Sequence, residues 1–389
     1  MTAEAARGLY IHIPYCRSKC GYCDLTSYTD AWGTLPAYLD ALPREAARYA
    51  GCAVDTVYIG GGTPSCLRLG DIARLMEVMR RVFRIAEDAE ISIEANPNSL
   101  DGEKAREFFG AGINRLSLGL QATQGELLRK IGRTHTYADF LRALEAAQAA
   151  GFSNISADLM YSLPTQSVAA AEESAEKLSA LPVTHISAYA LRLERGTPLF
   201  GAPQPDDDTD RAMFYAMMAR FREAGFARYE ISNFAKKGYA CRHNLKYWRG
   251  EEYVGLGVAA HSCFQVVRYG NTASIENYLS KVAAGVSATV QREAAEPVTE
   301  ALMLKTRLVE GIPLGELPRG RRAGSFLQKL LQTSYARVQD GAFCLTDHGM
   351  DLHNSIVVEL LEYAEQAPDE NFSDGNFGQK HCESPSCRV

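Results

Sequence analysis

The chain has 389 residues, of which 46% are hydrophobic and 23% are charged, and its formal net charge at pH 7 is -6. This composition is typical of a soluble globular protein large enough for two domains, and the acidic balance argues against nonspecific nucleic-acid binding. No apolar run is long enough to cross a bilayer, and the first eight residues lack the features of a secretion signal. With ten cysteines in no small-scaffold disulfide pattern, the sequence predicts a cytoplasmic protein.

Strand-like and helix-like segments alternate through the first half of the chain. Short β-rich runs predict strands at residues 8–14, 55–60, 90–95, 114–120, 154–161 and 185–191. Helical spacing predicts helices at residues 35–49, 69–83, 102–109, 137–150, 169–181 and 209–224. Such alternation predicts an α/β fold with a parallel sheet and outer helices, and six units suit an incomplete (β/α)6 barrel. Its active site would lie at the carboxyl ends of the strands.

Beyond about residue 271 the pattern becomes mostly helical. Helices are predicted at 275–284, 297–309, 325–331 and 350–363, and Asp340-Gly341 between two short strands predicts a hairpin over 336–346. This order is typical of a winged-helix-like domain, although Lys329 is the only basic residue in the candidate recognition helix, so packing is favoured over DNA binding. We divide the chain into a barrel (1–235), a connecting region (236–290), a C-terminal domain (291–365) and a disordered tail (366–389).

Three cysteines, Cys16, Cys20 and Cys23, directly follow the first predicted strand with C-x-x-x-C-x-x-C spacing. A [4Fe-4S] cluster normally takes four thiolates, so three leave one iron free to bind another ligand. The alternative is a zinc site closed by a remote His or Cys. Zinc cysteines come more often as C-x-x-C pairs from two loops, so a single loop favours the iron–sulfur cluster.

Polar or glycine-rich motifs mark most other predicted strand ends. Gly60-Gly61-Gly62-Thr63 lets the backbone approach a ligand, although a plain tight turn is the alternative. Glu94 can accept hydrogen bonds from ribose hydroxyls, and Arg133 can bind a carboxylate in bidentate fashion. Gln121 and Asp158 lie on the fourth and fifth strands. Each of these residues by itself can be part of a surface pair or a helix cap, but their occurrence at nearly every strand end favours one shared site.

These motifs resemble the HemN/HemW branch of the radical S-adenosylmethionine superfamily, in residues 10–23, 60–65, 93–97, 114–121, 158–164 and 229–261. The resemblance covers nearly the whole chain. It implies that Cys16, Cys20 and Cys23 hold a [4Fe-4S] cluster whose fourth iron is chelated by S-adenosyl-L-methionine. By position it implies a cofactor pocket lined by Tyr10, Tyr22, Gly61, Gly62, Thr63, Glu94, Gln121, Arg133 and Asp158. Within it, the glycine loop would meet the methionine amino group, Tyr22 the adenine and Glu94 the ribose.

Two local features distinguish the oxidases of this branch from its haem chaperones. The oxidases carry a fourth cysteine, C-x-x-x-C-x-x-C-x-C, and a longer segment before it, whereas this chain has Leu25 at that position and fifteen residues before Cys16. The chaperones are associated with H-N-x-x-Y-W, matched here by residues 243–248. An imidazole can ligate haem iron, so the resemblance implies haem as a ligand and His243 as its candidate, with Tyr247 a weaker one. The alternative role of this motif is to close the barrel against the second domain.

The sequence therefore predicts a haem chaperone that binds haem, a [4Fe-4S] cluster and S-adenosyl-L-methionine and transfers haem to acceptor proteins. The alternative is an oxygen-independent coproporphyrinogen III oxidase or another radical enzyme that modifies porphyrins. Leu25 counts against the oxidase, so whether the chain is an enzyme stays open. An electron donor is an expected partner, nucleic acid is not, and peripheral membrane contact is left open without a transmembrane segment.

Overall fold

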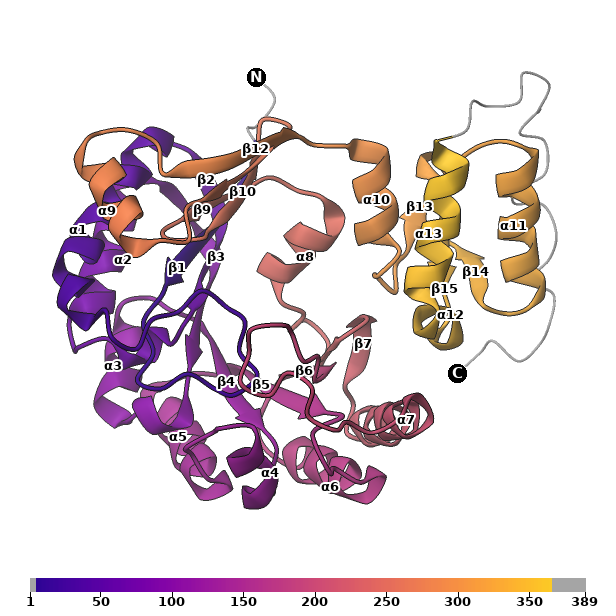
Figure 1. Ribbon diagram of the computed structural model, residues 1–389, viewed down its shortest axis with the longest axis horizontal. Coiled ribbons are helices and arrows are strands. Elements are labelled where there is room, and N and C mark those ends of the chain that lie inside the picture. The colour runs from indigo at the N-terminus through magenta and orange to yellow at the C-terminus, as the bar shows by residue number, and fades with distance from the viewer. Residues whose placement is uncertain (1–4, 366–389) are drawn as a thin grey trace. The chain divides into compact units, whose positions relative to one another are not determined.

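The computed structural model describes residues 5–365, which form two compact units (Figure 1). The first unit contains the chain up to Tyr247 together with Glu251–Ala295, and the second contains Trp248–Gly250 and the chain from Glu296. Most of the region expected to be a connection, 236–290, thus belongs to the first unit. The predicted tail, 366–389, lies outside the described residues.

A sheet of twelve strands forms the frame of the first unit. Its six central strands are parallel and confirm the predicted strands. They are, in spatial order, β1 (Arg7–Ile13), β2 (Ala53–Gly61), β3 (Arg84–Ala95), β4 (Arg115–Gln121), β5 (Asn154–Tyr161) and β6 (His185–Ala190). The helices between them are α1 (Leu35–Ala46), α2 (Asp71–Val82), α3 (Gly102–Gly110), α4 (Gly125–Lys130), α5 (Tyr137–Ala150), α6 (Val168–Ser179) and α7 (Asp207–Glu223). All but α4 were predicted, and the incomplete barrel is confirmed (Figure 1).

Short strands that the sequence did not predict extend this sheet at both ends. Next to β1 the order continues with β9 (Tyr253–Leu256), β10 (His261–Phe264), β11 (Val267–Asn271) and β12 (Thr289–Ala294). Next to β6 it continues with β8 (Asn233–Ala235) and β7 (Ala227–Glu230). Helix α8 (Arg242–Arg249) lies on the inner side of the curved sheet, and α9 (Ile275–Ala283) packs on α1 (Figure 1).

The two faces of the parallel strands differ in polarity. Leu9, Ile11 and Ile13 of β1 have no exposed surface and belong to the core shared with the outer helices. Because successive side chains of a strand point to opposite faces, Tyr10 and His12 face inward. The same alternation holds on the other strands, which turn Glu90, Glu94, Arg115, Ser117 and Asp158 inward. Parallel sheets are usually apolar on both faces, so a polar inner face indicates a surface reserved for function.

The second unit is mostly helical, as predicted. It contains α10 (Pro297–Lys305), α11 (Arg321–Gln332), α12 (Asp347–Asp351) and α13 (His353–Ala364). Its small sheet has the order β13 (Ile312–Pro313), β15 (Ala342–Leu345) and β14 (Ala336–Gln339). The predicted hairpin is confirmed, since Asp340 and Gly341 take positive φ values of 49° and 78°, as a type I′ turn requires. Across residues 5–365, no helix is long and apolar enough to cross a membrane.

Candidate functional site

The three cysteines lie in the loop between β1 and α1, beyond the carboxyl end of β1. The backbone fixes this loop from two sides. On one side the amide of Cys16 donates to the Tyr28 carbonyl at 3.0 Å, and the amide of Tyr28 donates to Pro14 at 2.7 Å. On the other side the amide of Gly21 donates to the Ile131 carbonyl, just after α4, at 3.0 Å. Backbone hydrogen bonds therefore anchor this loop to two different segments of the chain.

The sulfur atoms of this loop have different surroundings. Cys16 is buried and its Sγ lies 3.3 Å from Thr63 Oγ1, whereas Cys20 and Cys23 are half-buried. Burial raises the pKa of the Cys16 and Cys23 thiols, and each also senses the charge of Cys20. Arg133 donates from Nη1 to Cys20 Sγ at 3.5 Å. This donor set of three free thiols fits an iron–sulfur cluster.

A closed zinc site was the alternative from the sequence. Among residues 5–365, no three His, Cys, Asp or Glu side chains are grouped closely enough to be ligands of one metal ion. Ligands of a cubane cluster bind different irons, so the three cysteines need not meet at one point.

The glycine loop after β2 packs directly against the start of the cysteine loop. The amide of Gly62 donates to the Ile13 carbonyl at 2.8 Å, and that of Thr63 donates to Tyr15 at 2.9 Å. The amide of Gly61 donates to Glu94 Oε2 at 3.0 Å. These three amides are thus occupied within the protein, and the glycines let the two loops approach each other. Contact of this loop with the amino group of a ligand would involve its carbonyl oxygens and stays a prediction.

Glu94 and Asp158 lie on the inner face of the sheet, as their positions predicted. Glu94 Oε1 accepts from the Tyr58 hydroxyl at 2.9 Å, and Asp158 Oδ1 accepts from Ser117 Oγ at 3.2 Å. Burial, with the nearby Asp158 carboxyl, raises the pKa of Glu94 to about 7. Burial also raises the pKa of Asp158. The site therefore holds a carboxyl that titrates near neutral pH.

The raised pKa of Glu94 predicts a pH-dependent stability. The folded protein binds the proton of the Glu94 carboxyl more tightly than the unfolded chain does, so protonated Glu94 stabilises the folded state. This stabilisation is fully present below the ordinary pKa of a glutamate and is lost as the pH rises through about 7. Glu94→Gln cannot ionise. We expect the free energy of unfolding of Glu94→Gln to rise relative to that of wild type by about 2–3 kcal/mol between about pH 5 and about pH 8.

Urea unfolding of both proteins across this range measures that change. The control is Glu87→Gln, on an exposed position of the same strand, which should follow wild type at every pH. A constant difference between wild type and Glu94→Gln would contradict the assignment.

Gln121 and Arg133 meet at the end of β4. Gln121 has a positive φ of 66° at a β-bulge, and its buried Oε1 has no hydrogen-bond partner among residues 5–365. Arg133 Nη2 donates to the Gly119 carbonyl at 3.0 Å, so this side chain joins β4 to the cysteine loop. A strained backbone and an unpaired buried oxygen are both typical of a ligand site. Gln121 Oε1 is the acceptor that a bound ligand can satisfy.

Of the two tyrosines of the predicted pocket, Tyr10 lies on β1 and Tyr22 lies within the cysteine loop. Tyr22 packs against the apolar cluster around α4, which includes Leu127 and Ile131. Tyr10 stacks on Tyr58 at 6.3 Å on the inner face. The sequence analysis missed His12, whose Nδ1 lies 2.9 Å from the Tyr10 hydroxyl and whose Nε2 lies 2.8 Å from the Thr26 carbonyl. Its position two residues after Tyr10 on the same strand face was the available signal.

The structure places His243 away from the carboxyl edge, on α8 inside the barrel. Its ring is 1% exposed and stacks on Tyr58 at 5.3 Å. Nδ1 lies 2.9 Å from Thr56 Oγ1, and Nε2 lies 2.8 Å from the Tyr247 hydroxyl. Burial and the nearby positive charges of Lys246 and Arg115 lower the pKa of His243 to about 3, so the imidazole is neutral. Both ring nitrogens are occupied, and ligation of iron requires one of them to be released.

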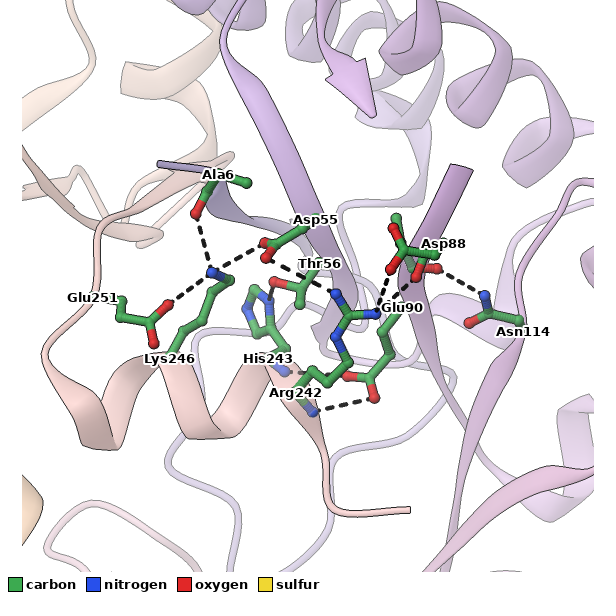
Figure 2. Close-up of polar contacts among 11 residues, drawn as sticks. Ala6, Asp55, Thr56, Asp88, Glu90, Asn114, Arg242, His243, Lys246 and Glu251 are labelled. Atoms are coloured by element: carbon green, nitrogen blue, oxygen red, sulfur yellow. Dashed lines mark hydrogen bonds and ion pairs between the residues drawn. The ribbon is translucent and has the colours of Figure 1, made fainter. Parts of the chain in front are cut away.

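Polar contacts attach α8 to the strands (Figure 2). Glu90 of β3 accepts from the amides of Arg242 and His243, each at 3.1 Å, and so caps the helix. Lys246 Nζ reaches Asp55 at 3.0 Å, Glu251 at 2.8 Å and the Ala6 carbonyl at 3.1 Å. These contacts attach the motif to the inner face of the strands, and haem binding by His243 stays a prediction.

Comparison with known proteins identifies the family. The family model described as Radical SAM superfamily matches residues 10–178, which include every residue expected to line the cofactor pocket. The haem chaperone HemW of Mycobacterium tuberculosis H37Rv is 36% identical over 371 residues, which cover 91% of this chain and 94% of that protein. The chain belongs to the HemW family. The HemW protein of Bacillus subtilis is 34% identical and covers 90% of this chain and 93% of its own length.

A solved structure supports the fold. The coproporphyrinogen III oxidase HemN of Escherichia coli superposes with a TM-score of 0.79 over 92% of this chain and 90% of that chain. Its sequence identity is 22%, so this likeness concerns the fold alone. HemW-family membership rests on the sequence relatives.

Proposed function

We propose that this member of the HemW family is a haem chaperone that binds haem, a [4Fe-4S] cluster and S-adenosyl-L-methionine and transfers haem to acceptor proteins. The observation that carries the proposal is 36% identity over 91% of the chain to proteins named haem chaperone HemW. Its eight described cysteines are all free, which suits a reducing cytoplasm. An external electron donor is part of this proposal.

The residues of the carboxyl edge have distinct roles in this proposal. Cys16, Cys20 and Cys23 hold the cluster, which supplies one-electron chemistry and an iron with an open position when bound. Arg133 lies against Cys20 and fixes the loop to β4. Gln121 accepts a hydrogen bond from S-adenosyl-L-methionine, whose positive charge the Glu94 and Asp158 carboxyls favour.

The oxidase is the second candidate, favoured by the HemN fold. Leu25, at the position of the missing fourth cysteine, is 52% exposed and offers no thiolate. The chaperone reading therefore predicts no loss of carboxyl groups from coproporphyrinogen III when reduced, cluster-loaded protein and S-adenosyl-L-methionine are incubated with it. Mass spectrometry of the porphyrin products measures this, and vinyl products would establish the oxidase instead.

Haem transfer tests the chaperone directly. We expect the purified protein to bind haem with a defined Soret band and to pass it to excess apomyoglobin faster than haem leaves bovine serum albumin. The comparison is made with and without a loaded cluster. Absence of a saturable haem complex would overturn the proposed function.

A further inference from the structure

The backbone of the glycine loop holds the hydroxyl of Thr63 against the sulfur of Cys16. Thr63 Oγ1 lies 3.3 Å from Cys16 Sγ, although the two residues are 47 positions apart in the chain. The amide of Thr63 donates to the Tyr15 carbonyl at 2.9 Å, and the carbonyl of Thr63 accepts from the amide of Cys66 at 2.9 Å. Because both backbone groups are bound and Pro64 restricts the chain that follows, the hydroxyl stays beside the sulfur.

The proton of this hydroxyl is available to the sulfur. Thr63 precedes the 3₁₀ turn Pro64–Cys66, where a threonine side chain usually accepts from a backbone amide, but it makes no such bond to this turn. Burial raises the pKa of Cys16, and the hydroxyls of Thr63 and Ser27 oppose this rise. The Ser27 hydroxyl donates its proton to the Leu25 carbonyl at 3.3 Å. Thr63 is therefore the better placed of the two hydroxyls to donate to Cys16 Sγ.

Cluster binding would fix the direction of this hydrogen bond. Between a thiol and a hydroxyl, either group can be the donor. Iron binds the thiolate, which has no proton, so a ligated Cys16 Sγ can only accept and Thr63 must donate. Cys16 is 7% exposed, so water screens the bond little. Hydrogen bonds to the ligand sulfurs are one of the factors that set the reduction potential of a cluster, because they stabilise the more negative, reduced state.

We propose that Thr63 donates a hydrogen bond to the Cys16 thiolate of the cluster-loaded protein and thereby raises the reduction potential of the cluster. The inference deepens the proposed function and rests on it, since it requires the cluster. Thr63 acts through Cys16, so it is a positioning residue and not a ligand. When the cluster accepts one electron, the bond between Cys16 and iron stays intact and Thr63 keeps its proton.

Thr63 is a cleaner position for a test than Arg133. The Arg133 guanidinium also contacts a cluster sulfur, that of Cys20 at 3.5 Å. It holds the cysteine loop to β4 through the Gly119 carbonyl as well, so its removal would disturb the loop and the potential together. The Thr63 side chain can be changed without loss of the backbone hydrogen bonds that join the two loops.

Redox titration of the anaerobically reconstituted full chain with dithionite, in the absence of S-adenosyl-L-methionine, tests the inference. The electron paramagnetic resonance signal of the reduced cluster measures the fraction that is reduced. Thr63→Val removes the hydroxyl and keeps a branched side chain. The equilibrium constant for its one-electron reduction should fall about tenfold, which lowers the potential by about 59 mV. Thr63→Ser retains a hydroxyl and should keep the wild-type potential.

The matched control is Thr29→Val, which removes a hydroxyl from an exposed position of the connection between β1 and α1 and should leave the potential unchanged. Iron and sulfide analysis shows which variants hold a cluster, and Thr63→Ala supplies the test if Thr63→Val holds none. An unchanged or higher potential in Thr63→Val, or an equal fall in Thr63→Ser, would overturn the inference. Loss of the cluster from both Thr63→Val and Thr63→Ala would also overturn it, because Thr63 would then serve assembly. Absence of a cluster in wild type would instead overturn the proposed function.

Discussion

Replacement of Cys20 by serine is expected to abolish the iron–sulfur cluster while the protein remains folded. Cys20 is half-buried and its sulfur contacts Arg133 Nη1 at 3.5 Å, so the loss of one sulfur removes a cluster ligand without opening a cavity in the core. Cys16→Ser and Cys23→Ser should have the same effect on the cluster. Iron and acid-labile sulfide, measured after anaerobic reconstitution, should fall to the background of protein that received no iron.

A matched control separates this effect from a general loss of thiols. Cys52 is also a half-buried free cysteine, but it lies just before β2 and outside the loop. Cys52→Ser should therefore keep the iron and sulfide content of wild type. Stoichiometric zinc in the reconstituted wild-type protein, or a cluster that survives in Cys20→Ser, would contradict the assignment.

The barrel could be predicted because its strands and helices carry clear periodic patterns. Leu9, Ile11 and Ile13 alternate with inward residues, and the outer helices cover them with apolar side chains. The site at the carboxyl ends followed from the same topology, which brings the ends of parallel strands to one edge. The six added strands, three to six residues long, were not predicted, because several of them follow one another directly and so depart from the regular strand–helix alternation that identified the other six.

Helix α8 shows what periodicity cannot reveal. Its two buried residues, His243 and Lys246, are polar, so the sequence has no apolar stripe there. Its amino-terminal cap is Glu90, more than 150 residues earlier in the chain. Such a long-range partner becomes visible only when the strands are folded.

One residue connects the predicted site residues at the carboxyl edge of the sheet with His243 on α8. Tyr58 donates to Glu94 at the carboxyl edge and stacks on His243 below it. The ring of Tyr10 lies on it as well. The sequence analysis did not select Tyr58, because a tyrosine within a strand is most often a packing residue.

Alanine at Gly62 is expected to disrupt the cysteine loop and lower both stability and cluster content. A Cβ atom at this position would lie 2.8–2.9 Å from the Tyr15 and Ile13 carbonyl oxygens and the Tyr15 nitrogen. These are backbone atoms of the segment that leads into Cys16, so the clash is relieved only if the loop moves. Overpacking of this kind costs about 2–3 kcal/mol.

The measurements are the urea midpoint and the iron bound after reconstitution, and Gly33→Ala is the matched control. Gly33 belongs to the same connection between β1 and α1, and an added Cβ there meets no heavy atom within 4 Å. Gly33→Ala should keep wild-type iron content, whereas Gly62→Ala should lose most of it. Because the hydrogen bonds from Gly62 and Thr63 hold the two loops together, wild-type stability and full iron content in Gly62→Ala would show that cluster binding does not depend on this contact.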